Sequence, residues 1–240
     1  MNIHIFQKGF NYAQDGQGNR LVYHLQGCNL ACPWCSNPEG MSFDGGNTVS
    51  VSDIVDEAVR CRPMFFDGGG VTFTGGECTC QFEPLSEALL CLRQQGISTA
   101  IETNATAPNL PALFGLVDEL IMDLKHDSNE IHRRVIGMGN TQILANLRAA
   151  CAVHPNVLVR IPLIGGFNAS VENIQRFAEL LETLPTDSVR IELLLYHEYG
   201  KEKWKKCGKA YTVKNAFVSE QERCAYEEIL RGRGLRVVRT

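Results

Sequence analysis

After residue 20 the chain alternates between short continuous apolar runs and segments whose apolar residues recur at helical spacing. The stretch 50–62 is typical of an amphipathic helix, because Val51, Ile54, Val55 and Ala58 fall on one face. The same reasoning predicts strands at 21–25, 70–74, 97–102, 119–124, 157–161 and 189–195 with a short one at 235–239, and further helices around 85–92, 143–150, 174–181 and 220–231.

Strands that alternate with helices in this way indicate an α/β fold built from βαβ units around a parallel sheet. Pro162 is expected to end the strand that starts at 157, because proline cannot donate to a strand ladder. The first 19 residues, with a turn at 15–18, resemble a small hairpin ahead of the main domain. We expect one domain over 1–240, with 1–19 as an N-terminal hairpin-like extension. In such folds ligands bind at the carboxyl ends of the strands.

Composition narrows the class of protein. A chain of 240 residues can bury one sizeable core, and a net charge of −4 gives no basic excess for a nucleic-acid or membrane surface. The first residues lack the layout of a signal peptide, and no apolar run approaches membrane-spanning length. Ten cysteines without an export signal favour a reducing compartment. We therefore expect a cytoplasmic protein without disulfides.

The most informative chemistry lies in the loop 27–40, where Cys28, Cys32 and Cys35 have C-x3-C-x2-C spacing. Three thiolates this close can each bind one iron of a [4Fe–4S] cube and leave the fourth iron open to a ligand that is not protein. A structural zinc site would require four ligands, commonly in two separated pairs, and a disulfide framework would require a small secreted chain. Both alternatives fit the sequence poorly.

Polar residues follow three other strands at their expected carboxyl ends. Gly75 and Gly76 would let a ligand approach the backbone closely, and Glu77 could pair with a cationic amine. Glu102 ends the next strand, and a pair formed by Asp123 and Lys125 ends the one after that. Together these residues would place both positive and negative charges at the bottom of a site for a zwitterionic ligand. The plainer alternatives are an ordinary glycine turn and solvated loop charges.

The cysteine loop, with Trp34 just before its last cysteine, resembles the signature of the radical S-adenosylmethionine (radical SAM) enzymes, and Gly75-Gly76-Glu77 resembles their G-G-E motif. This resemblance implies a partial, open (β/α)6 TIM-like barrel of the radical SAM type. It also implies S-adenosylmethionine on the free iron and its cleavage by one electron to a 5′-deoxyadenosyl radical. The segments 123–126, 130–137, 159–168 and 193–201 further resemble the activating enzymes of glycyl radical enzymes, of the pyruvate formate-lyase type.

The resemblance implies a role for each matching residue. Cys28, Cys32 and Cys35 would bind the cluster. The residues implied to contact S-adenosylmethionine are Trp34, Cys35, Ser36, Gly75, Gly76, Glu77, Asp123, Leu124, Lys125, Arg160 and His197. Glu102, Thr103 and Asp123 match positions that hold a monovalent cation, although the family has aspartate where this chain has Glu102.

Other features depart from the family or are absent. Cys78 stands where the family usually has proline, Ile164-Gly165-Gly166 replaces a proline-glycine pair, and Leu195 stands where proline is common. A second cluster at Cys78 and Cys80 is an alternative to two small semi-buried hydrophobic residues. The lysine-rich segment 201–206 is expected to be solvated, with contact to an acidic partner as a second interpretation.

The stretch between Cys35 and Cys78 contains only Cys61, so the chain resembles the single-cluster type without a ferredoxin-like insert. Its electron would then come from an external donor such as flavodoxin or ferredoxin.

The resemblance predicts an oxidoreductase, a monomeric activase of anaerobic metabolism that abstracts hydrogen from a glycine of a large glycyl radical enzyme. The alternative is a radical SAM enzyme acting on a small molecule, such as a 7-carboxy-7-deazaguanine synthase. A third class, an iron–sulfur electron carrier, predicts a cluster that does not respond to S-adenosylmethionine. Neither nucleic acid nor membrane is expected as a partner.

Overall fold

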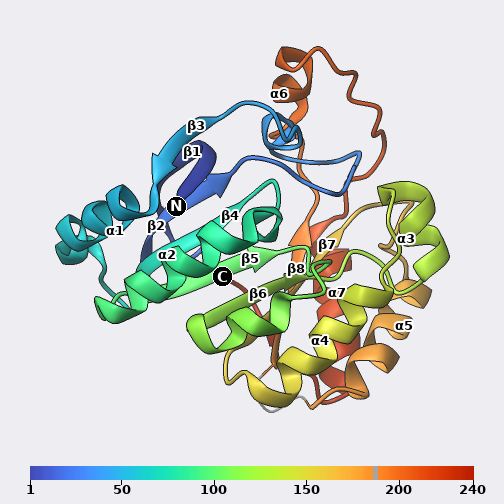
Figure 1. Cartoon of the computed structure of the whole chain (residues 1–240). Helices are drawn as coiled ribbons and strands as arrows, with labels where there is room; N and C mark the ends of the chain where they lie inside the picture. The colour runs from blue at the N-terminus through green and yellow to red at the C-terminus, as the bar shows by residue number, and fades with distance from the viewer. Residues whose placement is uncertain (186–188) are drawn as a thin grey trace.

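The computed structural model describes residues 1–185 and 189–240, which form an open, partial (β/α)6 barrel (Figure 1). One nine-stranded sheet has the order β3-β1-β2-β4-β5-β6-β7-β8-β9, and β2 and β4–β9 are parallel. The strands are β1 Asn2–Tyr12, β2 Asn19–Leu25, β3 Asn47–Ser50, β4 Gly70–Gly75, β5 Ser98–Thr103, β6 Glu119–Asp123, β7 Val157–Leu163, β8 Val189–Leu195 and β9 Val237–Val238.

Helices lie between successive parallel strands along the chain, and most of them cover the outside of the sheet, whereas α6 (Lys201–Lys206) lies beside the loop that follows β2 (Figure 1). They are α1 Val51–Arg60, α2 Phe82–Gln94, α3 Asn129–Ile136, α4 Thr141–Val153, α5 Val171–Glu182, α6 Lys201–Lys206 and α7 Glu220–Gly232, with 3₁₀ turns at Pro38–Gly40, Arg62–Met64, Cys78–Gln81 and Leu110–Leu116. The fold class predicted from the sequence is confirmed, and so are the strands and helices expected there. None of the described helices combines the length and apolar composition needed to cross a bilayer.

The expectation that Pro162 ends its strand is wrong, because β7 continues to Leu163 and pairs Pro162 with Leu194 of β8. The N–H of Leu124 donates to the carbonyl of Arg160 at 2.8 Å, and the β6–β7 ladder ends there. Residues 160 and 162 point their backbone groups to the same side of β7, since the strand repeats every two residues. The missing N–H of Pro162 therefore faces the side where β6 has already ended.

The N-terminal hairpin is larger than expected and is not separate from the sheet. β1 pairs antiparallel with β2, so the second strand of the hairpin is also the first parallel strand of the barrel. β3 then pairs with the outer edge of β1. The single-domain extent of 1–240 stays a prediction.

Side chains alternate across the barrel wall. Phe73, Ile101, Met122, Ile161 and Leu193 belong to the main apolar core, which lies between the sheet and its helices. Residues adjacent to these in the same strands are polar and point into the barrel. They include Thr72, Thr74, Glu102, Arg160 and Glu192. The sheet is therefore buried on both sides, by hydrocarbon outside and by a polar network inside.

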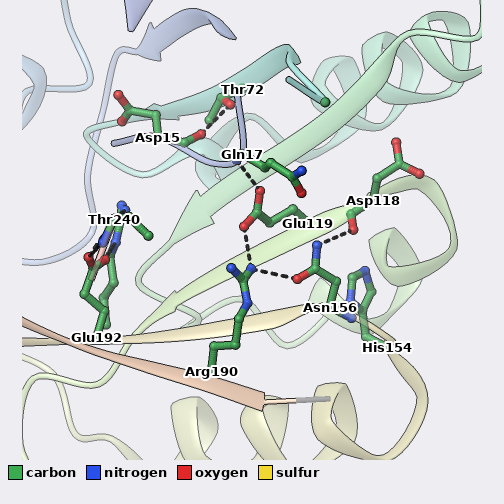
Figure 2. Close-up of polar contacts among 12 residues, drawn as sticks. Asp15, Gln17, Thr72, Asp118, Glu119, His154, Asn156, Arg190, Glu192 and Thr240 are labelled. Atoms are coloured by element: carbon green, nitrogen blue, oxygen red, sulfur yellow. Dashed lines mark hydrogen bonds and ion pairs between the residues drawn. The ribbon is translucent and has the colours of Figure 1, made fainter. Parts of the chain in front are cut away.

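The turn between β1 and β2 closes the amino end of the barrel (Figure 2). The buried carboxylate of Glu119 accepts the N–H of Gln17 at 2.7 Å and pairs with Arg190 at 2.6 Å. Thr72 donates its hydroxyl to the carbonyl of Asp15 at 2.7 Å. The amino end is thus sealed by hydrogen bonds between the chain's own groups.

Candidate active site

A pocket of about 330 Å³ opens at the carboxyl ends of β4 to β8, where ligands bind in parallel α/β folds. Such a volume suits a small molecule. The structure brings most of the predicted site residues to its wall. These are Cys28, Cys32, Trp34, Cys35, Ser36, Gly75, Gly76, Glu77, Glu102, Thr103, Asp123, Lys125 and His197.

The three cysteine thiols of the loop line this one pocket and are largely buried. Burial raises the pKa of Cys28 and of Cys32 to about 12, and raises that of Cys35 as well. Backbone N–H groups of Leu30 and Asn37 point at the sulfurs of Cys28 and Cys35, each at 3.4 Å. Such donors favour the thiolate form that binds iron.

Within residues 1–185 and 189–240, no three histidine, cysteine or acidic side chains converge closely enough to hold a single metal ion. A structural zinc site would require a fourth ligand beside the three thiols. A four-iron cube instead takes each thiolate at a separate iron. The donor set, its spacing and its common pocket therefore fit a [4Fe–4S] cluster.

Gly75 and Gly76 allow the end of β4 to pack against the cysteine loop. The N–H of Gly76 donates to Leu25 O at 2.9 Å, and the N–H of Glu77 donates to Gly27 O at 2.8 Å. A Cβ on Gly76 would lie 2.3 Å from the carbonyl oxygen of Gly40, and Gly75 has φ of +121°. Both positions therefore require glycine for the fold itself, as well as for any approach by a ligand.

Glu77 is 2% exposed, and donors of the chain itself occupy its carboxylate. One oxygen accepts the N–H and hydroxyl of Thr79 at 3.0 and 2.6 Å and the hydroxyl of Thr103 at 2.6 Å. The other accepts the N–H of Asn104 at 2.6 Å. The expected pairing with a ligand amine would compete with these four donors. The geometry fits a positioning residue that ties the end of β4 to the end of β5.

Three ion pairs form the pocket floor and the layer beneath it. Lys125 contacts Asp123 at 2.5 Å, and Arg160 contacts Glu102 at 2.7 Å and Glu192 at 2.8 Å. Burial alone would lower the pKa of Lys125, but the carboxylate of Asp123 raises it above its ordinary value, so the ammonium stays charged. Burial raises the pKa of Glu102 although Arg160 opposes this effect.

The three residues expected to hold a monovalent cation are already engaged. Glu102 is bound by Arg160 and by the hydroxyl of Thr74 at 3.1 Å, and Asp123 is paired with Lys125. The hydroxyl of Thr103 donates to Glu77. In this arrangement the residues do not fit a small cation, because two side-chain cations already neutralise the carboxylates.

Leu124 and Arg160 are the two predicted contacts that do not line the pocket. Leu124 directly follows the inward-facing Asp123, so its side chain points outward into the apolar core. Arg160 is 4% exposed and lies below Glu102. Both side chains lie behind the pocket wall in this structure, and the two assignments stay predictions.

Sequence reasoning missed Tyr196 and Asn104, which also line the pocket. Asn104 donates to the side chain of Asn29 at 2.9 Å and so connects β5 to the cysteine loop. The signal for Asn104 was its place directly after a strand end, beside Glu102 and Thr103. Tyr196 directly precedes His197, which sequence reasoning did identify.

Cys78 and Cys80 lie outside the pocket lining. Cys78 is fully buried, and its thiol donates to the carbonyl of Glu102 at 3.4 Å. The segment offers two thiols, fewer than the four that usually hold an iron–sulfur cluster. Cys78 packs as part of the core.

The segment 201–206 is not simply a solvated stretch. Trp204 is 9% exposed, and its indole N–H donates to the carbonyl of Cys35 at 2.9 Å. Lys203 bonds the side chain of Asn37 at 2.8 Å and pairs with Glu39 at 2.8 Å. Helix α6 therefore holds the outer side of the cysteine loop.

The barrel and its three-thiol loop define a protein of the radical SAM class, and the Radical SAM superfamily model matches residues 22–181. The chain is 35% identical over 234 residues to pyruvate formate-lyase 2-activating enzyme of Escherichia coli K12, covering 83% of this chain and 79% of that protein. It is 31% identical to pyruvate formate-lyase-activating enzyme of Clostridium pasteurianum, covering 87% and 88%. The chain belongs to the pyruvate formate-lyase-activating enzyme family of the radical SAM superfamily.

Solved structures agree with this assignment. A domain of the pyruvate formate-lyase-activating enzyme from Bacteroides vulgatus aligns with a TM-score of 0.59 and 32% identity over 71% of this chain and 98% of that one. A radical SAM methyltransferase from Sphaerobacter thermophilus aligns with a TM-score of 0.68 over 99% of this chain and 76% of that one. At 17% identity, the second match supports the fold alone.

Proposed function

We propose that this chain is a glycyl radical enzyme activase, whose substrate is a glycine residue of a large partner enzyme. When bound, the [4Fe–4S] cluster and S-adenosylmethionine supply one electron that breaks a sulfonium C–S bond and a radical that takes a hydrogen atom from the glycine Cα. The products are methionine, 5′-deoxyadenosine and a glycine-centred radical on the partner. One observation carries the proposal: three cluster-spaced thiols and the strand-end residues share one pocket in a chain similar to activating enzymes.

The chain's own residues bind and orient the two groups. Cys28, Cys32 and Cys35 would hold three irons, which leaves the fourth iron facing the pocket. The charged pair of Asp123 and Lys125 would meet the zwitterionic methionine end of S-adenosylmethionine, since opposite charges attract strongly in a partly dry site.

Trp34, Ser36, Gly75 and Gly76 would form the walls around S-adenosylmethionine. His197 completes the wall from the end of β8, and burial lowers its pKa, so its imidazole is neutral near pH 7. A neutral imidazole can both donate and accept a hydrogen bond. Holding the reactants in this way supplies rate by orientation and by exclusion of water.

The further assignments follow from the same function. The partner is a large glycyl radical enzyme, and the electron comes from an external carrier such as flavodoxin or ferredoxin. We propose a monomer in the cytoplasm that acts on neither nucleic acid nor membrane. A monovalent cation is not part of the proposal, because the residues expected to bind it are paired with Arg160 and Lys125.

The test is anaerobic. The reconstituted protein, a neutral photoreductant and S-adenosylmethionine are mixed with a glycyl radical enzyme encoded beside its gene, and the glycine-centred signal is recorded by electron paramagnetic resonance. A signal, with 5′-deoxyadenosine formed in proportion, supports the proposal. 5′-Deoxyadenosine without a glycine signal would point to a small-molecule substrate, and no 5′-deoxyadenosine at all would point to an electron carrier.

A further inference from the structure

The lysines of the chain are concentrated in one short stretch. Six of its eight lysines lie between residues 201 and 214, together with a single glutamate, in a protein whose net charge is −4. Elsewhere basic positions are almost all arginine. A local excess of positive charge on an acidic protein produces a distinct patch of positive potential.

This stretch includes the helix that holds the cysteine loop. Trp204 bonds the carbonyl of Cys35, and a Cβ on Gly200 would lie 2.5 Å from that same oxygen. Figure 1 shows α6 (orange) beside the blue loop that follows β2. The outer surface of this helix is thus separated from a cluster ligand by one side chain and one backbone group.

The lysines of the stretch divide into two groups. Lys201 and Lys203 pair with Glu198 and Glu39, each at 2.8 Å. Lys205, Lys206 and Lys209 lie within five residues of one another, and we call them the lysine face. They are exposed, as is Lys214, and none of the four has a carboxylate within 4.0 Å in the described part of the chain. Their ammonium groups are available to another molecule.

We propose that the lysine face is the docking surface for an acidic one-electron carrier protein that reduces the cluster. This inference rests on the proposed function, because each cleavage of S-adenosylmethionine uses one electron and the cluster must then be reduced again. Between Cys35 and Cys78 the sequence has only Cys61 and so offers no ferredoxin-like cysteine group, which favours a separate carrier as the source of the electron. In the docked complex one electron passes from the carrier to the oxidised cluster, and no bond forms or breaks.

The choice of lysine fits a carrier that must leave after each electron. Lysine presents a mobile, strongly hydrated point charge, whereas arginine makes rigid bidentate pairs. Electron-transfer encounters are small and weak, and complementary charge raises their association rate rather than their lifetime. An acidic carrier would therefore be attracted to this face without being held there.

The experiment compares two donors on two triple variants. One variant carries Lys205→Glu, Lys206→Glu and Lys209→Glu. The matched control carries Arg60→Glu, Arg148→Glu and Arg236→Glu, which change the net charge equally at exposed sites away from α6 that form no ion pair in the described structure. The donors are reduced flavodoxin, which is acidic, and photoreduced 5-deazariboflavin, which is small and uncharged.

We expect cluster reduction by flavodoxin at low salt to slow at least about tenfold in the lysine variant, and far less in the arginine control, because electrostatic steering contributes about 10- to 1,000-fold to association. The rate with 5-deazariboflavin should be unchanged in both, which also verifies that the cluster site is intact. Added salt should slow the wild type with flavodoxin and leave the lysine variant nearly unaffected.

Two results would overturn the inference. Equal slowing of both triple variants by flavodoxin would mean that only net charge matters. Normal reduction of the lysine variant by flavodoxin, with loss of glycine-radical formation, would assign the face to the glycyl radical enzyme instead. Failure of the proposed function is recognised separately, because the wild type with 5-deazariboflavin would then give no glycine radical.

Discussion

The two ends of the barrel contain similar residues in different arrangements. At the amino end, the carboxylate of Glu119 accepts hydrogen bonds from Arg190 and from the backbone of the turn 13–18 (Figure 2). At the carboxyl end, the charged pairs are also formed, but the loops stand apart and leave a pocket lined by three thiols. Buried charge by itself therefore does not mark a functional site. The combination of charge, nucleophilic or metal-binding groups and open volume does.

The largest effect is expected from Cys32→Ala, at the open end. Losing one of three cluster ligands should leave no intact [4Fe–4S] cluster and abolish S-adenosylmethionine cleavage. Iron content and visible absorption after anaerobic reconstitution measure the first effect, and 5′-deoxyadenosine measures the second. Cys151→Ala, in α4, is the matched control and should retain both. A normal cluster in Cys32→Ala would refute the ligand assignment.

At the closed end, Glu119→Leu should cost about 3 kcal/mol of unfolding free energy, because it leaves Arg190 and the N–H of Gln17 without their buried acceptor. Urea unfolding of the cluster-free protein measures this loss. Glu119→Gln keeps an acceptor and should cost less. Affinity for S-adenosylmethionine should be unchanged in the folded, reconstituted variants. A marked loss of affinity with normal stability would contradict the separation of the two ends.

Lys125→Met should keep the cluster but weaken S-adenosylmethionine binding by about tenfold or more, since a charge-assisted contact contributes about 1.5–3 kcal/mol. Asp123 also loses its partner in this variant. The readout is the change that S-adenosylmethionine causes in the spectrum of the reduced cluster, titrated against its concentration. Lys125→Arg should recover part of the affinity. An unchanged titration would remove Lys125 from the cofactor site.

The smallest effect is expected from exchanging cations. Replacing sodium and potassium with tetramethylammonium at constant ionic strength should change S-adenosylmethionine affinity less than about twofold, because Arg160 and Lys125 already neutralise the floor carboxylates. The same spectral titration provides the measurement. A strong requirement for potassium or sodium would show that these ion pairs open to admit a cation.

The sequence predicted most of the fold because helical and strand spacing alone sets the order of the elements. It also predicted that three thiols share one site, because Cys28, Cys32 and Cys35 lie within eight residues of one another. The positions of Leu124 and Arg160 outside the pocket lining could not be predicted from the resemblance that assigned them. Those positions depend on the face of the strand and on the stagger between strands.

Several contacts between distant parts of the chain could not be predicted from the sequence. Trp204 donates to the carbonyl of Cys35 across 169 residues. No spacing rule connects the lysine-rich segment after β8 to the cysteine loop after β2. The hydrogen-bond donors of the Glu77 carboxylate were also not predicted. Its position after two glycines indicated a ligand contact, but its donors Thr103 and Asn104 come from the next strand end.

The seal at the amino end has a consequence for folding order. The turn between β1 and β2 is synthesised first, yet Gln17 finds its acceptor 102 residues later and Gln14 meets Arg160 after 146 residues. Contacts of such high sequence separation form slowly, because a long loop must close before they stabilise anything. We infer that the polar groups of the β1–β2 turn stay exposed to solvent while the rest of the chain is synthesised. The contacts of this turn with Glu119 and Arg160 then form late and complete the barrel.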